Sequence, residues 1–326
     1  MFGPFVHNID PIFGKIGPFY LWFYGASFTA GFLGIFFCLK RARKQLSISL
    51  SEVYSLTIFM ALGVLVFGRL VEVVFYEWEH YAFHLLHIPA VWLGGMSTHG
   101  IMLGAIIGMA IFCRVYSKSF LSIADVLAIG GAYVMGMGRI GNFIDGQIVG
   151  SVTDVAWGVK FPDAEGFRHP VVLYDGIKNL LLIPFLLLIR HFAPPRGVLI
   201  AHFLLWYGLL RIPIDFFREY RTELYGFPPG QEFNLLMTFL GLGMLFRIYR
   251  KVKRTGDVVY PEPIGGPEYS SSQPAPVQRI VFILLLLFPT IIPSDWTQDV
   301  PERYGKRHEG LKHTDFYPVI ETAEEQ

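Results

Sequence analysis

Long hydrophobic runs separated by short polar connections dominate the pattern along the chain. Seven runs approach the roughly 20 apolar residues that a transmembrane helix needs, and they lie at about 19–39, 53–76, 98–113, 122–144, 171–190, 197–217 and 231–249. The third run is short and flanked by glycines, which indicates a tilted or re-entrant segment. An eighth run, Ile280–Pro293, is shorter and contains Pro289, so it stays unassigned, with an interfacial helix as one interpretation. The pattern predicts an all-α polytopic membrane protein with about seven transmembrane helices.

Basic residues alternate in density between successive connections. One set of connections carries thirteen Lys and Arg, including Lys40–Lys44 and Arg247–Arg254, whereas the other set carries five. Connections rich in Lys and Arg remain on the cytoplasmic side. We therefore expect the N-terminus to lie outside and the seventh helix to end inside.

Three regions follow along the chain. Residues 1–254 form the expected transmembrane catalytic domain, and its largest outer connection, 145–170, contains WGVKFP and is expected to form a small folded head. Residues 255–278 are rich in proline, glycine and serine, which is typical of a linker. Residues 279–326 combine the short apolar run with a polar tail that we expect to be loosely ordered. No internal repeat is visible, which disfavours an inverted-repeat transporter.

Composition supports the membrane assignment and excludes several other classes. Hydrophobic residues make up 53% of the 326 positions and charged residues only 16%. The net charge of +1 gives no reason to expect a nucleic-acid partner. Cys38 and Cys113 form neither a zinc spacing nor a disulfide framework, and the N-terminus lacks the pattern of a signal peptide. His80, His84 and His87 share a helical face. An amphipathic interfacial helix is a simpler interpretation of this pattern than a metal site.

Four basic residues fall within or at the edge of the apolar runs: Arg69, Arg139, Lys178 and Arg211. A cation at the centre of a membrane helix costs about 2.5–3.5 kcal/mol on insertion scales, so each needs a partner or an aqueous cavity. Lys178 lies near a helix end, where its side chain is expected to extend to the interface. Arg69 has Glu72 one turn later as a candidate partner, and its role stays open between structure and function.

Arg139 and Arg211 are the stronger candidates for function. Asn142 follows Arg139 at i+3 and therefore shares its helix face, while Gly138 and Gly141 leave room for a ligand or a neighbouring backbone. The structural alternative pairs Arg139 with Asp145 and Arg211 with Asp215. Two arginines in the outer halves of apolar helices otherwise indicate a site for an anion with an apolar body, such as a phospholipid headgroup.

Two further residues could take part in such a site. His99 lies in the glycine- and hydroxyl-rich stretch GGMSTHG, and a neutral imidazole is well suited to accept a proton near neutral pH. The alternative is a histidine that serves only as a structural donor. Tyr24, in LWFYGASF, is by default an interfacial aromatic residue.

The stretch GRIGNFIDGQIVG, residues 138–150, resembles the signature of the prolipoprotein diacylglyceryl transferase family of the bacterial inner membrane. Supporting stretches occur in the expected order: WFYG around Tyr24, FGRL around Arg69, GGMSTHG around His99, WGVKFP, HPVVLYD, YGLLR with FFRE, and GQ at 230–231. The resemblance implies transfer of a diacylglyceryl group from phosphatidylglycerol to the lipobox cysteine of a prolipoprotein signal peptide. A thioether forms and glycerol phosphate leaves, with no metal or organic cofactor.

The resemblance also implies roles for individual residues. Arg139 and Arg211 would bind the phosphate and stabilise its charge as it leaves, and His99 would act as base or proton relay. Asn142 and Tyr24 would orient the headgroup or the backbone. The remaining residues expected at the substrate site are Arg69, Gly138, Gly141, Asp145, Gln147 and Gly150.

The signature departs from the family pattern at its polar end. The family's asparagine-glycine-glutamate is Asp145-Gly146-Gln147 here, the basic residue after the last glycine is Ser151, and the glutamate after the tyrosine is Asp175. Gln147 cannot accept a proton as a carboxylate does. Three functions therefore stay open: an active transferase, a non-catalytic relative that binds phospholipid or signal peptide, and a transferase with an altered donor or acceptor.

Overall fold

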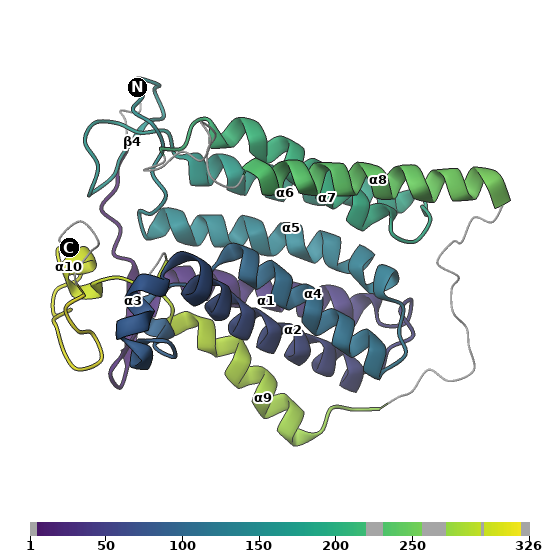
Figure 1. Cartoon of the computed structure of the whole chain (residues 1–326), viewed down its shortest axis with the longest axis horizontal. Coiled ribbons are helices and arrows are strands. Elements are labelled where there is room, and N and C mark those ends of the chain that lie inside the picture. The colour runs from purple at the N-terminus through teal and green to yellow at the C-terminus, as the bar shows by residue number, and fades with distance from the viewer. Residues whose placement is uncertain (1–4, 220–230, 256–271, 295–296, 321–326) are drawn as a thin grey trace.

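Long, roughly parallel helices make up most of the molecule (Figure 1). The computed structural model describes residues 5–219, 231–255, 272–294 and 297–320. Its long helices are α1 (Phe23–Ala42), α2 (Leu50–Val71), α4 (Thr98–Val115), α5 (Phe120–Ile144), α6 (Val171–His191), α7 (Val198–Asp215) and α8 (Gln231–Thr255). All but α8 are long and apolar enough to cross a membrane by length and composition. Helix α8 packs along α7 and ends in a basic stretch, so the expected seven-helix membrane architecture is confirmed.

Helix α4 corrects the expectation of a tilted or re-entrant third segment. It is a regular helix of 18 residues, and its glycines are the points at which it packs on α2. A β-carbon on Gly100, Gly104 or Gly108 would collide with the α2 backbone at Phe67, Gly63 or Phe59. Small residues at a spacing of four let two membrane helices approach closely, so these glycines bring the helices together and do not interrupt α4.

Short elements connect the helices at the end that carries the N-terminus, which we call the outer end after the orientation expected from the sequence. Strand β1 (Phe5–Val6) pairs in parallel with β4 (Val159–Lys160), and β2 (Ile12–Ile16) pairs antiparallel with β3 (Phe19–Trp22). The first segment therefore begins as a strand, and its helix starts only at Phe23. Strand β4 and the bridges of Val152 and Val159 to Arg168 fold the head predicted at 145–170.

A second group of short helices follows α2 at the same end. These are η1 (Glu72–Tyr76), α3 (Trp78–Phe83), η2 (Leu85–His87) and η3 (Val91–Leu93). Phe83, Leu85 and Leu86 are between 63% and 89% exposed. An exposed apolar group beside polar residues fits the interfacial position predicted for this connection.

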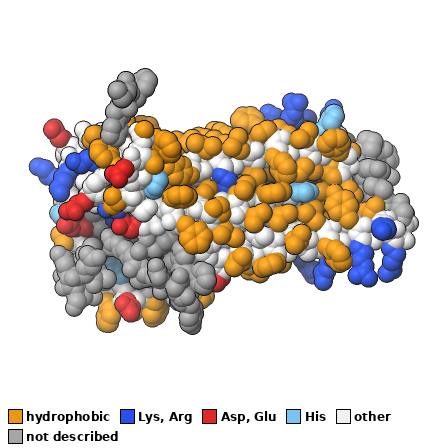
Figure 2. Space-filling view, turned by 90° about the horizontal axis from the view of Figure 1, so that it is seen from above, with side chains coloured by type: hydrophobic (Ala, Val, Ile, Leu, Met, Phe, Trp, Pro, Cys, Tyr) orange, Lys and Arg blue, Asp and Glu red, His pale blue; other side chains and the backbone are white. Residues whose placement is uncertain are grey.

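The surface separates into an apolar belt and two charged ends. Figure 2 shows hydrophobic side chains over the middle of the molecule, Lys and Arg at the end where α8 finishes, and both signs of charge at the opposite end. Exposed residues such as Leu62, Leu103 and Phe239 belong to the long helices. A contiguous apolar surface of this kind suits contact with lipid tails.

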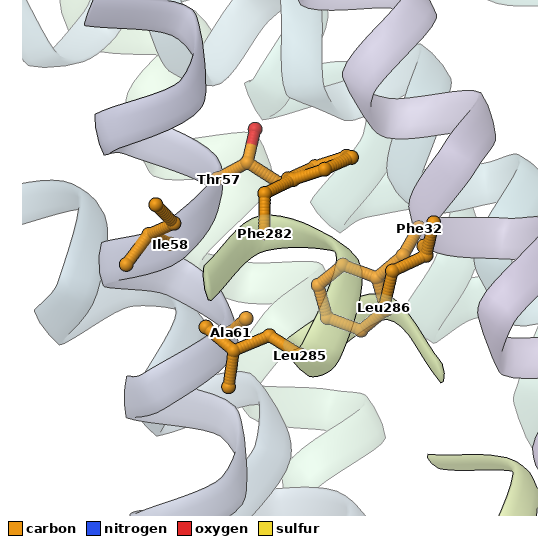
Figure 3. Close-up of a pocket in the computed structure, with 7 residues that line it drawn as sticks. All are labelled: Phe32, Thr57, Ile58, Ala61, Phe282, Leu285 and Leu286. Atoms are coloured by element: carbon orange, nitrogen blue, oxygen red, sulfur yellow. The ribbon is translucent and has the colours of Figure 1, made fainter. Parts of the chain in front are cut away.

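The unassigned eighth run forms α9 (Pro276–Leu287) and η4 (Phe288–Ile291), which pack on α1 and α2. At the inner end, Gln278 hydrogen-bonds Ser51 and Ser55 near the start of α2. Midway, Phe282, Leu285 and Leu286 lie against α2 and Phe32 of α1 (Figure 3).

The segment then continues to the outer end, where the next residues lie beside the end of α5. The sixteen helical residues rise about 24 Å, and their contacts extend from Ser51 at the start of α2 to Gly25 near the start of α1. The run therefore forms a helix that packs along the bundle. It is shorter than the six helices that are long and apolar enough to cross a membrane.

The tail corrects the expectation of loose order. Helix α10 (Val300–Tyr304) and the residues up to 320 pack on the β2–β3 hairpin. Tyr304 and Tyr317 are fully buried, and the Tyr317 hydroxyl accepts a hydrogen bond from the Tyr20 amide. The predicted linker at 255–278 lies largely outside the described residues, although Pro276–Gln278 form the first turn of α9.

Candidate active site

A buried carboxylate gathers three cations between α5, α6 and α7. Asp175, on the first turns of α6, is fully buried. Its oxygen Oδ2 accepts from Nε of Arg139 at 2.6 Å and from Nη1 of Arg211 at 2.5 Å, while Oδ1 lies 2.8 Å from Nζ of Lys178. Because α5 and α7 end and α6 begins at the outer end, the cluster lies only a few residues inside it.

A second carboxylate extends this cluster to α8. Asp215 pairs with Arg211 one turn earlier at 2.7 Å and accepts a hydrogen bond from Asn234 at 2.9 Å. Ions taken out of water need such partners, because each carries a desolvation cost of several kcal/mol. Among the residues that the structure describes, three cations against two carboxylates leave a formal surplus of one positive charge in the cluster, which favours binding of an anion.

Asn142 joins this cluster to the polar end of the signature. Its Oδ1 accepts from Nη1 of Arg139 at 3.1 Å, and its Nδ2 donates to the Ser294 hydroxyl at 2.7 Å. The Ser294 amide in turn donates to Asp145, which is fully buried, at 3.1 Å. The segment that follows η4 therefore lies directly against the end of α5.

Gln147 is bound by the same part of the chain. Its Oε1 accepts from Arg303 at 2.5 Å, and its Nε2 donates to the Tyr304 hydroxyl at 3.1 Å. The side chain is 2% exposed. The neutral amide of Gln147 therefore hydrogen-bonds the C-terminal segment through both its oxygen and its nitrogen.

The sequence profile of prolipoprotein diacylglyceryl transferases matches residues 11–247. The chain belongs to the prolipoprotein diacylglyceryl transferase family. It is 36% identical over 252 residues to the phosphatidylglycerol–prolipoprotein diacylglyceryl transferase of Geobacter sulfurreducens, covering 75% of this chain and 97% of that protein. The proteins of the same name from Marinomonas sp. and Nitrosomonas europaea are also 36% identical, over 73% and 74% of this chain and 92% and 91% of theirs.

The part matched to the transferase family stops before the C-terminal segment. The profile ends at residue 247, whereas α9, Ser294, Arg303 and Tyr304 all lie beyond it. The residues that bind Asn142, Asp145 and Gln147 from this side are therefore additions to the matched transferase region.

The signature glycines lie where other parts of the chain approach closely, as the alternative of a neighbouring backbone predicted. A β-carbon on each would collide with another part of the chain: Gly138 with Phe28, Gly141 with Tyr24 and Ser27, and Gly150 with the carbonyls of His169 and Phe217. The space beside them is filled by α1 and by the ends of α6 and α7. These glycines bring helices together and do not leave room for a ligand.

His99 lies between the outer connection and α8. It stands in the first turn of α4, its Nδ1 is 3.0 Å from the Tyr76 hydroxyl, and its ring centroid is 4.1 Å from that of Phe233. Phe233 precedes Asn234, the partner of Asp215, on α8. The role of His99 as a proton acceptor stays a prediction.

Tyr24 stands at the start of α1, beside the signature. Its ring packs edge-on against Phe28 at 5.0 Å between centroids, and its backbone lies against Gly141. Tyr24 therefore lies next to the end of α5, and its orienting role stays a prediction.

Arg69 does not pair with Glu72 in the way the spacing suggested. Its guanidinium stacks 4.9 Å from the centroid of Tyr81 and donates to the backbone carbonyls of His87, Ile88, Ala90, Gly94 and Gly95. One buried cation thus fixes the outer connection between α2 and α4. These contacts support the structural alternative for Arg69, and its place at the substrate site stays a prediction.

Two other expectations need correction. Arg139 pairs with Asp175 and not with Asp145, whose carboxylate accepts from Ser294. Lys178 does not extend to the interface: it is 7% exposed, pairs with Asp175 and lies 4.0 Å above the ring of Tyr207. The pairing of Arg211 with Asp215 is confirmed.

The sequence argument missed Asp175 and Lys178 as members of the site. A carboxylate and an amine three residues apart in an apolar helix share one face, and this was the available signal. No spacing rule pointed to Ser294 or Arg303, because their contacts span more than 150 positions.

Metal ligation finds no support in the described part of the chain, where no group of three His, Cys, Asp or Glu side chains is placed to hold an ion. His80, His84 and His87 stack on one another with ring centroids 4.7–5.4 Å apart. Burial and the two neighbouring imidazoles lower the pKa of His80 to about 4.

Proposed function

We propose that this chain transfers the diacylglyceryl group of phosphatidylglycerol to the thiol of a lipobox cysteine in a prolipoprotein. The sulfur attacks the glycerol carbon that carries the phosphate, a C–S bond forms, and the C–O bond to the phosphate breaks. Glycerol phosphate leaves, and the thiol proton passes to a base. The observation that carries this proposal is the pair of arginines on Asp175, in a cluster with surplus positive charge at the outer end of the bundle.

The proposed role of each site residue follows from its position in the structure. Arg139 and Arg211 bind the phosphate and stabilise the charge that develops as the bond breaks, since a guanidinium can donate two parallel hydrogen bonds to phosphate oxygens. Asp175 fixes both guanidinium groups in advance, so little reorganisation is needed during the reaction. Asn142 and Tyr24 orient the headgroup beside them.

His99 is proposed to take the proton from the thiol. When its Nδ1 donates to the Tyr76 oxygen, Nε2 is left as the acceptor. A thiolate is the nucleophilic form of cysteine, so removal of this proton accompanies attack.

The proposed location is the bacterial cytoplasmic membrane, with the N-terminus and the site on the outer side. Thirteen basic residues in one set of connections against five in the other support this orientation. The donor lipid would enter the site from the bilayer.

The test is a transfer assay with the full-length protein in phosphatidylglycerol vesicles and a lipobox peptide. Active protein adds one diacylglyceryl group to the peptide, seen by mass spectrometry, and releases glycerol phosphate. The same peptide with serine in place of cysteine gives no adduct. Binding of both substrates without a thioether would favour a non-catalytic relative, and an adduct only with another lipid or acceptor would favour an altered transferase.

A further inference from the structure

The segment beyond residue 247, where the family match ends, places Ser294 in contact with the signature residues 138–150. Ser294 is fully buried, with its hydroxyl on Asn142 and its amide on Asp145. A buried serine that contacts two signature residues, 152 and 149 positions away, serves more than the packing of its own segment.

The Asn142 amide is bound on both sides, by Arg139 and by the Ser294 hydroxyl. Because Arg139 has only donors, Oδ1 faces it, and the Ser294 hydroxyl accepts from the Nδ2 on the other side. The reversed amide would direct two N–H donors at a guanidinium, which has only donors itself. Ser294 thus acts on Arg139 through Asn142.

Arg303 acts on the other end of the signature. Its guanidinium donates to the amide oxygen of Gln147, and Tyr304 accepts from the amide nitrogen. A hydrogen bond from a cation is stronger than one between neutral groups. Gln147, two residues beyond the end cap of α5, is therefore fixed by two successive residues around the end of α10.

The segment formed by α9 and η4 holds Ser294 beside the end of α5. Thr29 of α1 donates to the carbonyl of Leu286 at 2.8 Å, and Gly25 leaves space for the backbone of Pro289. Both contacts lie on α1 within a few residues of Tyr24, so the segment that ends in Ser294 is anchored to a helix of the site.

We propose that Ser294 and Arg303 are positioning residues of the transfer reaction, which orient Asn142 and Gln147 from outside the family's matched region. The proposal rests on the proposed function. Arg139 must meet the phosphate as its charge grows, and a donor that is already oriented contributes most at that moment. The loss of Ser294 therefore lowers kcat and leaves the KM for phosphatidylglycerol nearly unchanged.

The decisive experiment compares Ser294→Ala with Ser294→Thr in the full-length protein. We expect Ser294→Ala to lower kcat about 10-fold, and Ser294→Thr, which keeps the hydroxyl, to recover to within about twofold of the wild type. Thr290→Ala is the matched control, because that hydroxyl donates only within its own turn, to Leu287, and its loss leaves kcat unchanged.

A double-mutant cycle tests Arg303. We expect Arg303→Ala and Gln147→Ala each to lower kcat, and the double variant to lose less than the sum of the two single losses, because both changes remove the hydrogen bond between Arg303 and Gln147.

The outcomes separate the two proposals. Wild-type protein that forms no thioether contradicts the proposed function, and the positioning roles with it. An active wild type with an unchanged kcat in Ser294→Ala contradicts the positioning role alone. Equal losses in Ser294→Ala and Ser294→Thr, with lowered thermal stability, would make Ser294 a packing residue and also overturn the inference.

Discussion

Replacement of Asp175 by asparagine tests the electrostatic account of the site. The amide keeps the shape of the side chain but removes the charge that Arg139, Arg211 and Lys178 share. The surplus in the cluster then rises from one positive charge to two. Removal of one partner from a buried ion pair costs about 3–5 kcal/mol, because the remaining charge stays desolvated.

This loss of folding stability is large enough to be measured as a fall in the melting temperature, Tm. With an unfolding entropy of about 2 cal/mol/K per residue over 326 residues, it corresponds to a fall in Tm of about 5 °C. Thermal unfolding in detergent can be followed by a dye that reacts with the buried thiol of Cys113 as it becomes accessible.

Two further variants make the result specific. The double variant Asp175→Asn with Lys178→Met restores the surplus of one positive charge in the cluster. We therefore expect this double variant to recover at least half of the lost stability. Glu219→Gln removes a carboxylate that pairs with Arg168 but is 56% exposed, and an exposed pair contributes at most about 1 kcal/mol. A Tm for Asp175→Asn equal to that of the wild type would refute the reasoning.

Three other predictions concern Gln147, His80 and the orientation of the chain in the membrane. Gln147→Glu places a carboxylate beside Arg303, so we expect higher thermal stability with a turnover within about threefold of the wild type; a gain of tenfold or more would show that the amide limits catalysis. The lowered pKa of His80, about 4 against an ordinary value of 6.5, means that the unfolded chain binds the proton more readily, so stability falls as the pH drops from about 6.5 towards 4. His80→Gln should flatten this part of the profile, and an unchanged slope would exclude His80 as its source. Lys312→Cys should react with a membrane-impermeant maleimide in intact cells, whereas Lys253→Cys should react only after permeabilisation; the opposite pattern would invert the proposed topology.

Apolar length and basic-residue bias predicted the helical bundle well, because both reflect the bilayer directly. The errors arose where a tertiary partner changed the meaning of a local pattern. Phe19–Trp22 is apolar enough for a helix start but pairs with β2, and a short apolar run does not distinguish strand from helix. The glycines of α4 suggested an interruption, although α2 packs against them. The tail looked unstructured because it is polar, yet Tyr304 and Tyr317 supply it with a core.

In the candidate site, too, some residues could be identified from local sequence and others only from tertiary contacts. Arg139 and Arg211 were identifiable because a cation in an apolar helix requires a reason. Asp175 was noted only as a departure from the family pattern, and the proximity of Lys178 to a helix end suggested an interfacial side chain. The contacts of Ser294, Arg303 and Tyr304 with the signature depend on how the chain returns across the bundle through α9. No local pattern contains that information.

The central claim is that Arg139, fixed by Asp175 and Asn142, stabilises the leaving phosphate. Its most direct test is the rate of thioether formation by Arg139→Ala in phosphatidylglycerol vesicles, with membrane insertion checked in parallel. We predict a loss of about 10²–10³-fold in kcat, the range found when a single charge-stabilising donor is removed, with insertion intact. Turnover at the wild-type rate would contradict the claim and make Arg139 a structural residue.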